Sequence, residues 1–152
     1  MAGILRLVKK NYKKEDMKGL AKNLLEGLKP SSGATILLLE GELGAGKTTF
    51  TQALAYHLGY SGSVVSPTFV IQKRYPIAFG FFQNLIHIDS YRLKSPKEIE
   101  ALGWFDWIKN PGNLIVVEWP SLILSALPKE VYKILFKHVD EDTRSIEITH
   151  EK

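Results

Sequence analysis

The sequence predicts an α/β fold, a mostly parallel sheet flanked by helices and followed by a C-terminal antiparallel hairpin. Three short apolar runs, residues 34–39, 85–88 and 114–117, are typical of buried parallel strands. Apolar residues at helical spacing lie between such runs. Two further strand-like segments, 132–138 and 145–149, are joined by the polar turn VDEDTR and are expected to pair as the hairpin.

The N-terminal part predicts a short strand and then an amphipathic helix. Residues 4–8 can form the strand, and apolar residues recur every three or four positions over 17–28, which marks one buried stripe. We expect Asn11 to cap this helix and Pro30 to end it.

The middle of the chain predicts two more helices and one extended segment. A helix follows the glycine-rich stretch GELGAGKTT and is expected to end at Gly59. The segment SGSVVSPTFVIQKRYPI is expected to be extended, because Pro67 excludes a helix across it. Another helix should begin at Ser95, with Pro96 in its first turn and Glu98 placed for a capping box.

Length and composition predict one domain over residues 1–152. Of its 152 residues, 45% are hydrophobic and 24% charged, which is ordinary globular usage. The absence of cysteine excludes disulfides and thiolate metal sites and is compatible with a reducing cytoplasm. No apolar run approaches the ~20 residues of a membrane-spanning helix, and the start of the chain lacks the apolar region of a signal peptide. We therefore expect a cytoplasmic protein with no membrane association.

The net charge of +4 is concentrated near the start, in KKNYKKEDMK. This cluster is either a contact for nucleic acid or an acidic protein, or a solvated helix face. The scarcity of arginine and of interleaved aromatic residues favours the solvated face.

The stretch GELGAGKTT carries the strongest functional signal. Gly41, Gly46, Lys47 and Thr48 match the Walker A pattern G-x-x-x-x-G-K-[ST], with a predicted strand before it and a predicted helix after it. Glycines let backbone N–H groups converge on phosphate oxygens, the lysine neutralises the β and γ phosphates, and the threonine hydroxyl binds Mg²⁺. The sequence thus predicts a P-loop NTPase-like fold.

Two acidic residues follow apolar runs at the expected nucleotide edge of the sheet. Asp89 and Glu118 each end a predicted strand, and the carboxyl ends of parallel strands face the ligand crevice. One carboxylate should reach Mg²⁺ and the other should orient or deprotonate a water. The alternative is that either one caps a helix or pairs with Arg92.

The ordered set GELGAGKTT, SPTF, HIDSYRL and VEWP resembles the bacterial TsaE (YjeE) family. LGYSGSVV before the second motif and EIEALGWFDWI before the last extend the resemblance over residues 19–120, and it continues more loosely in the hairpin. The resemblance implies a small P-loop ATPase required for threonylcarbamoyladenosine beside the anticodon of tRNAs. Its hydrolysis would be weak alone and would reset a TsaD–TsaB complex, with only indirect contact to tRNA.

The motif and the resemblance together predict a set of site residues. The expected ATP-binding residues are Gly41, Glu42, Leu43, Gly44, Ala45, Gly46, Lys47, Thr48, Thr49 and Arg144. The expected metal ligands are Thr48, Asp89 and Glu118, and the expected catalytic residues are Glu118, Asp89, Lys47 and Thr68. By similarity, Thr68 belongs to a switch-like loop near the γ-phosphate, although a plain turn or cap also explains it. Glu42 departs from the aspartate expected of the family.

Several aromatic and histidine residues have two explanations. His87, in the family's H-x-D, is either functional or a hydrogen-bonded histidine at a strand end. Trp119 follows Glu118 in the family's E-W pair and could also fill the core. Trp104 and Trp107 are expected in the core, and any exposed part of their cluster would be a partner surface.

Other P-loop classes fit less well. A GTPase needs an N-K-x-D after the loop, which is missing, and the one D-x-x-G precedes the loop. A small-molecule or nucleotide kinase commonly has an arginine-bearing lid, and only Arg74, Arg92 and Arg144 follow the loop. A kinase and a nucleotide-dependent binding module with negligible hydrolysis both stay open as alternatives to an Mg²⁺-dependent ATPase.

Overall fold

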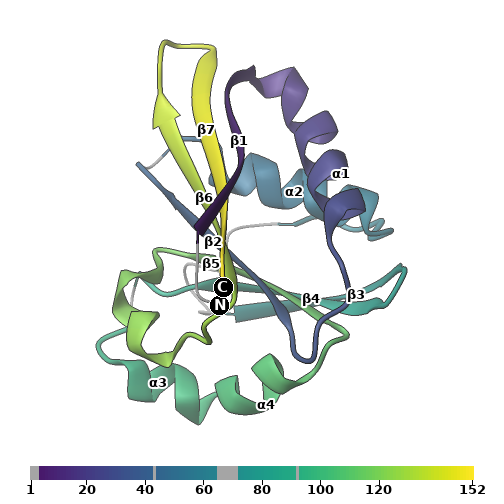
Figure 1. Ribbon diagram of the computed structural model, residues 1–152, viewed down its shortest axis with the longest axis vertical. Helices are drawn as coiled ribbons and strands as arrows, with labels where there is room; N and C mark the ends of the chain where they lie inside the picture. The colour runs from purple at the N-terminus through teal and green to yellow at the C-terminus, as the bar shows by residue number, and fades with distance from the viewer. Residues whose placement is uncertain (1–3, 43, 65–71, 92) are drawn as a thin grey trace.

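The computed structural model describes residues 4–42, 44–64, 72–91 and 93–152. Within them, one sheet has the strand order β1-β7-β6-β2-β5-β4-β3 (Figure 1). The strands are β1 Ile4–Lys13, β2 Thr35–Gly41, β3 Gln72–Phe79, β4 Phe82–Asp89, β5 Asn113–Glu118, β6 Val131–His138 and β7 Thr143–Glu151. The helices are α1 Met17–Gly27, α2 Lys47–His57, α3 Pro96–Ala101 and α4 Trp104–Lys109, with 3₁₀ turns η1 Lys14–Asp16 and η2 Pro120–Ala126.

The centre of the sheet is parallel and its edges are antiparallel. Neighbours β6, β2, β5 and β4 pair in parallel, while β7 pairs antiparallel with both β6 and β1, and β3 pairs antiparallel with β4. The predicted parallel sheet with a C-terminal hairpin is therefore confirmed.

Helices cover both faces of the sheet. In Figure 1, α1 and α2 lie on one side and α3 and α4 on the other. Side chains alternate between two apolar clusters, so that Leu37 and Leu39 pack with α1 and α2, whereas Ile36 and Leu38 pack with α3 and α4. The same alternation places Leu85 and Leu114 on the face that carries α2. Every second residue after them, up to Asp89 in β4 and Glu118 in β5, lies on that face too.

The start of the chain differs from the expectation. The first strand continues to Lys13, so Asn11 pairs with Ser145 of β7 and does not cap α1, which has Asp16 at its N-cap position. Pairing with β7 gives hydrogen-bond partners to those N–H and C=O groups of the polar residues after Val8 that face β7. The lysine cluster accordingly lies mostly on a strand and a turn, where Lys10, Lys13 and Lys14 are exposed, and only Lys18 lies on the exposed face of α1.

No helix in the described residues combines the length and the apolar character needed to cross a membrane.

Candidate functional site

The glycine-rich loop connects the end of β2 with the start of α2. Gly46, at the N-cap of α2, has φ 105°, a left-handed conformation that side chains disfavour. At Gly41 a Cβ would stand 2.7 Å from the carbonyl oxygen of Phe136, so only glycine fits against β6. The first-turn N–H groups of α2 have no partner within the helix, and they point toward the loop. Such a corner is suited to bind an anion.

Lys47 is buried at this corner. Its Nζ donates a hydrogen bond to the carbonyl oxygen of Gly41 at 2.7 Å and lies 3.7 Å from the centre of the Trp119 ring. Burial lowers the pKa of Lys47, and the charges of Glu118 and Asp89 oppose that shift. The loop thus holds an ammonium group between a carbonyl, an aromatic face and two nearby carboxylates.

Asp89 and Glu118 lie side by side at the ends of β4 and β5. They are direct partners in the parallel register, and each is only 4% exposed. The carboxylate of Asp89 accepts a hydrogen bond from the backbone N–H of Tyr91 at 2.9 Å. Oε2 of Glu118 lies 2.6 Å from Nε2 of His87, which is fully buried. The two acids on which the prediction depends are therefore adjacent, and both face the side of the sheet that carries α2.

Trp119 is positioned by an unusual backbone conformation. Its φ of 57° is the one positive value at a non-glycine residue in the described part of the chain. The Ser90 hydroxyl donates to the carbonyl oxygens of Glu118, at 3.0 Å, and of Trp119. The indole is half-buried, packs against Tyr91 and covers Lys47. Trp119 therefore lies over Lys47 at the loop and does not fill the core.

Arg144, at the start of β7, reaches the loop from the hairpin that joins β6 and β7. Its Nη2 donates to the carbonyl oxygen of Gly44 at 3.4 Å. Beside this contact is a cavity of about 240 Å³, lined by Lys14, Met17, Gly44, Gly46, Thr49, Glu141, Asp142 and Arg144. The motifs did not indicate Met17, Glu141 or Asp142, and Lys14 was considered only as part of the lysine cluster. For Glu141 and Asp142 the one signal in the sequence was their place beside Arg144 in the hairpin turn.

The remaining predicted residues are distributed around the loop. Thr48 and Thr49 are half-buried in the first turn of α2, Ala45 is buried, and Glu42 is exposed. Leu43, Thr68 and Arg92 lie outside the described residues.

The two tryptophans between the motifs pack as expected. Trp104 is fully buried and donates its indole N–H to the carbonyl oxygen of Ala126 at 2.9 Å, and Trp107 is also buried. Leu102 and Phe105 of the same segment are exposed. The core prediction is confirmed for both tryptophans.

A cavity of about 700 Å³ lies away from the loop, between α1 and the strands of the hairpin, with Tyr12, Asn23, Tyr132 and His150 in its lining. None of the predicted site residues lines it. We place the candidate site at the loop because the buried ammonium, the paired carboxylates and the helix N-terminus meet there.

A metal at the loop would need ligands beyond the protein. Among the described residues, no group of three or more His, Cys, Asp or Glu side chains is arranged to hold a metal ion. Mg²⁺ is commonly bound by one or two carboxylates together with substrate phosphates and water. The oxygen donors of Thr48, Asp89 and Glu118 fit that pattern.

Known proteins resemble this chain over most of its length. The family model described as "Threonylcarbamoyl adenosine biosynthesis protein TsaE" matches residues 11–146. A Rickettsia bellii relative, named tRNA threonylcarbamoyladenosine biosynthesis protein TsaE, is 38% identical over 138 residues, covering 90% of this chain and 90% of its own. A Bacillus subtilis relative of the same name is 40% identical over 135 residues, covering 89% and 80%. The crystal structure of Bacillus subtilis YdiB has a TM-score of 0.74 and 34% identity, covering 100% of this chain and 88% of that one. The chain therefore belongs to the TsaE family.

Proposed function

We propose that this protein is a Mg²⁺-dependent ATPase of a single domain that serves threonylcarbamoyladenosine modification of tRNA through a TsaD–TsaB complex. The observation that carries the proposal is the buried Lys47 at the corner of β2 and α2, beside Asp89 and Glu118. The names of the relatives support the tRNA modification. A cytoplasmic location follows from this role.

The loop residues bind the triphosphate in this proposal. Backbone N–H groups from Gly41 to Thr49 surround the phosphates, and the ammonium of Lys47 leaves the carbonyl of Gly41 to neutralise them. Arg144, already at Gly44, adds a second positive charge. The 240 Å³ cavity next to Arg144 has room for part of the nucleoside.

The carboxylates carry out the hydrolytic step. Bound Mg²⁺ would neutralise charge on the β and γ phosphates, with Thr48 and Asp89 as its protein ligands. Glu118 orients the attacking water and accepts its proton, since it is buried at the same edge of the sheet. Thr68 is assigned to the γ-phosphate by family similarity.

The partner complex sets the rate in this proposal. ATP and Mg²⁺ stabilise the conformation that binds TsaD and TsaB, and hydrolysis releases it. Contact with tRNA is indirect, through those proteins.

The test is to follow ATP labelled on its γ-phosphate with Mg²⁺, with and without purified TsaD and TsaB. We expect slow release of labelled phosphate by the protein alone and faster release with both partners. Transfer of the label to a metabolite would establish a kinase instead. ATP binding with no turnover in the full mixture would leave a binding module and contradict the ATPase.

A further inference from the structure

We infer that His87 is a positioning residue that holds Glu118 in its working orientation through one carboxylate oxygen. This inference rests on the proposed function and adds a residue to it. The distance from His87 Nε2 to Glu118 Oε2 is 2.6 Å, which is short for a hydrogen bond from nitrogen to a carboxylate. The bond joins residues 31 positions apart in the chain and crosses from β4 to β5.

The ring geometry fixes which group donates. Nδ1 of His87 is buried and has no hydrogen-bond partner among the described residues. A buried N–H without an acceptor is unfavourable, so the proton belongs on Nε2, the nitrogen that faces Glu118. An ionised carboxylate can only accept. His87 therefore donates to Oε2, and the imidazole is committed to this one contact.

The register of the strands explains why the histidine, and not the aspartate, takes this role. His87 is opposite Val116, and Asp89 is opposite Glu118. His87 thus contacts Glu118 diagonally from two residues earlier in β4, which is nearer the middle of the sheet. Asp89 lies directly beside Glu118 at the carboxyl end of the strands. A donor beneath the carboxylate orients it without occupying the edge where phosphate and water would enter.

One oxygen of Glu118 remains for chemistry. Oε2 accepts the hydrogen bond from His87. Among the described residues Oε1 has no hydrogen bond, so it is available to a water. A flexible glutamate that must receive a proton from water needs such support, because catalytic groups act well only when neighbouring side chains lock their rotamers. Loss of His87 should therefore lower turnover and leave ATP affinity intact.

Three substitutions of His87 distinguish a role of its hydrogen bond from a role of its side-chain volume. In His87→Gln, the amide Nε2 stands the same number of bonds from Cα as the imidazole Nε2, and it can donate to Glu118. The shorter His87→Asn places its donor where Nδ1 stood, and His87→Ala has no donor. Each variant should be compared with the parent for ATP affinity by calorimetry, for thermal unfolding, and for kcat in the TsaD–TsaB mixture.

We expect kcat to fall about tenfold or more in His87→Ala and His87→Asn, the range typical of a supporting residue behind an active group. His87→Gln should regain most of the rate, and ATP affinity should stay within about twofold in all three. In a Glu118→Gln background, His87→Ala should lower kcat only slightly further, because the two residues act as one unit.

Opposite results would overturn the inference. These are parental kcat in all three variants, equal loss in His87→Gln and His87→Asn, a fall in ATP affinity and melting temperature that parallels the fall in kcat, or full additivity with Glu118→Gln. If the parent itself shows no turnover with both partners, the proposed ATPase fails and this inference fails with it. A parent that turns over beside unaffected His87 variants removes the inference alone.

Discussion

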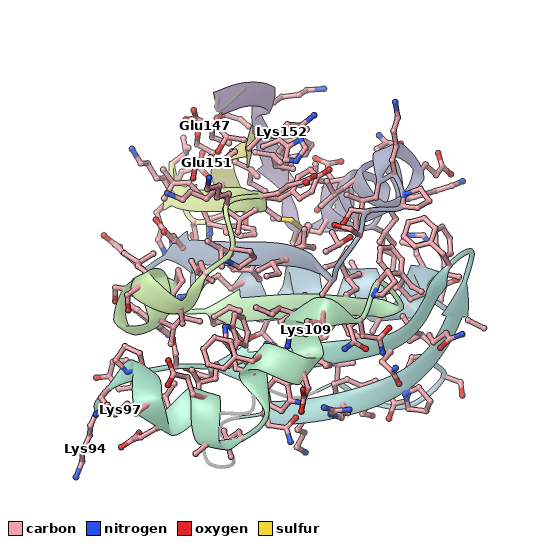
Figure 2. All side chains as sticks on the ribbon, turned by 60° about the horizontal axis from the view of Figure 1, so that its bottom comes forward. Lys94, Lys97, Lys109, Glu147, Glu151 and Lys152 are labelled. Carbon is pink, nitrogen blue, oxygen red and sulfur yellow. The ribbon has the colours of Figure 1, made fainter. Side chains whose placement is uncertain are left out.

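At the scale of single residues, the proposed function gives Lys47 the central part in nucleotide binding. Its ammonium is buried, held by the Gly41 carbonyl and covered by Trp119. Lys47→Ala should weaken ATP binding about hundredfold or more, because it removes the charge that neutralises the phosphates. Calorimetric titration with ATP and Mg²⁺ measures this. Lys109→Ala is the matched control, because Lys109 is an exposed lysine on α4 (Figure 2), across the sheet from α2. Equal ATP affinity in the two variants would contradict the role assigned to Lys47.

Lys47 also makes a prediction about pH. Burial lowers its pKa below the ordinary 10.5 in the folded protein. The unfolded chain therefore binds more protons at this residue in the pH range just below 10.5, and stability rises as pH climbs through that range. Lys47→Met lacks this contribution. Thermal unfolding of both proteins from neutral pH to 10.5 should show the parent gaining on the variant, and a constant difference in melting temperature would contradict it.

Residues within one local motif could be predicted from sequence, and contacts between distant residues could not. The loop from Gly41 to Thr49 follows from a pattern whose spacing is set by its own backbone. The His87–Glu118 bond and the cover of Trp119 over Lys47 depend on strand register and on the left-handed backbone at Trp119. The sequence predicted that both acids end strands, but it could not predict that His87 would contact Glu118 or that Trp119 would cover Lys47.

At the scale of elements, α4 packs on the sheet through Trp104 and Trp107, and Trp104 is the more deeply buried of the two. The Trp104 side chain is fully buried in the apolar cluster shared by α3, α4 and the sheet. Its indole N–H donates a hydrogen bond to the carbonyl oxygen of Ala126 in η2. Trp104→Ala should lower the free energy of unfolding by about 3–5 kcal/mol, the usual cost of emptying a buried aromatic site. The neighbouring Phe105→Ala, exposed in α4, should change it by about 0.5 kcal/mol or less. Denaturant unfolding measures both, and similar values for the two would show that α4 is not anchored in this way.

Sequence predicted the strands that are continuous apolar runs and missed part of a strand that is held only by pairing. Strands β2, β4 and β5 are continuous apolar runs, and their prediction was confirmed. The polar second half of β1 carries no such signal, because it is an edge strand held by β7. The Asn11 cap was wrong for this reason. At α3, Pro96 is in the first turn as expected, but Glu98 accepts from the N–H of Lys94 and not from that of Ser95.

At the scale of the whole molecule, the loop and both acids lie at one edge of the parallel strands, so a partner at that edge can sense the nucleotide. The two helical layers leave this edge to loops and strand ends (Figure 1). We expect TsaD and TsaB to co-purify with the parent in ATP and Mg²⁺ and to be lost when ATP is omitted. Lys47→Ala should fail to retain them under either condition. Equal retention with and without ATP would contradict a nucleotide-dependent complex.

The most direct test of the account is the rate of phosphate release from ATP by Glu118→Gln, in Mg²⁺ and with TsaD and TsaB present. The substitution keeps the size of the side chain and removes its capacity to accept a proton from water. We expect a rate about a hundredfold or more below that of the parent, with ATP affinity unchanged. A variant that releases phosphate at the parental rate would contradict the claim that this buried carboxylate carries out the hydrolytic step.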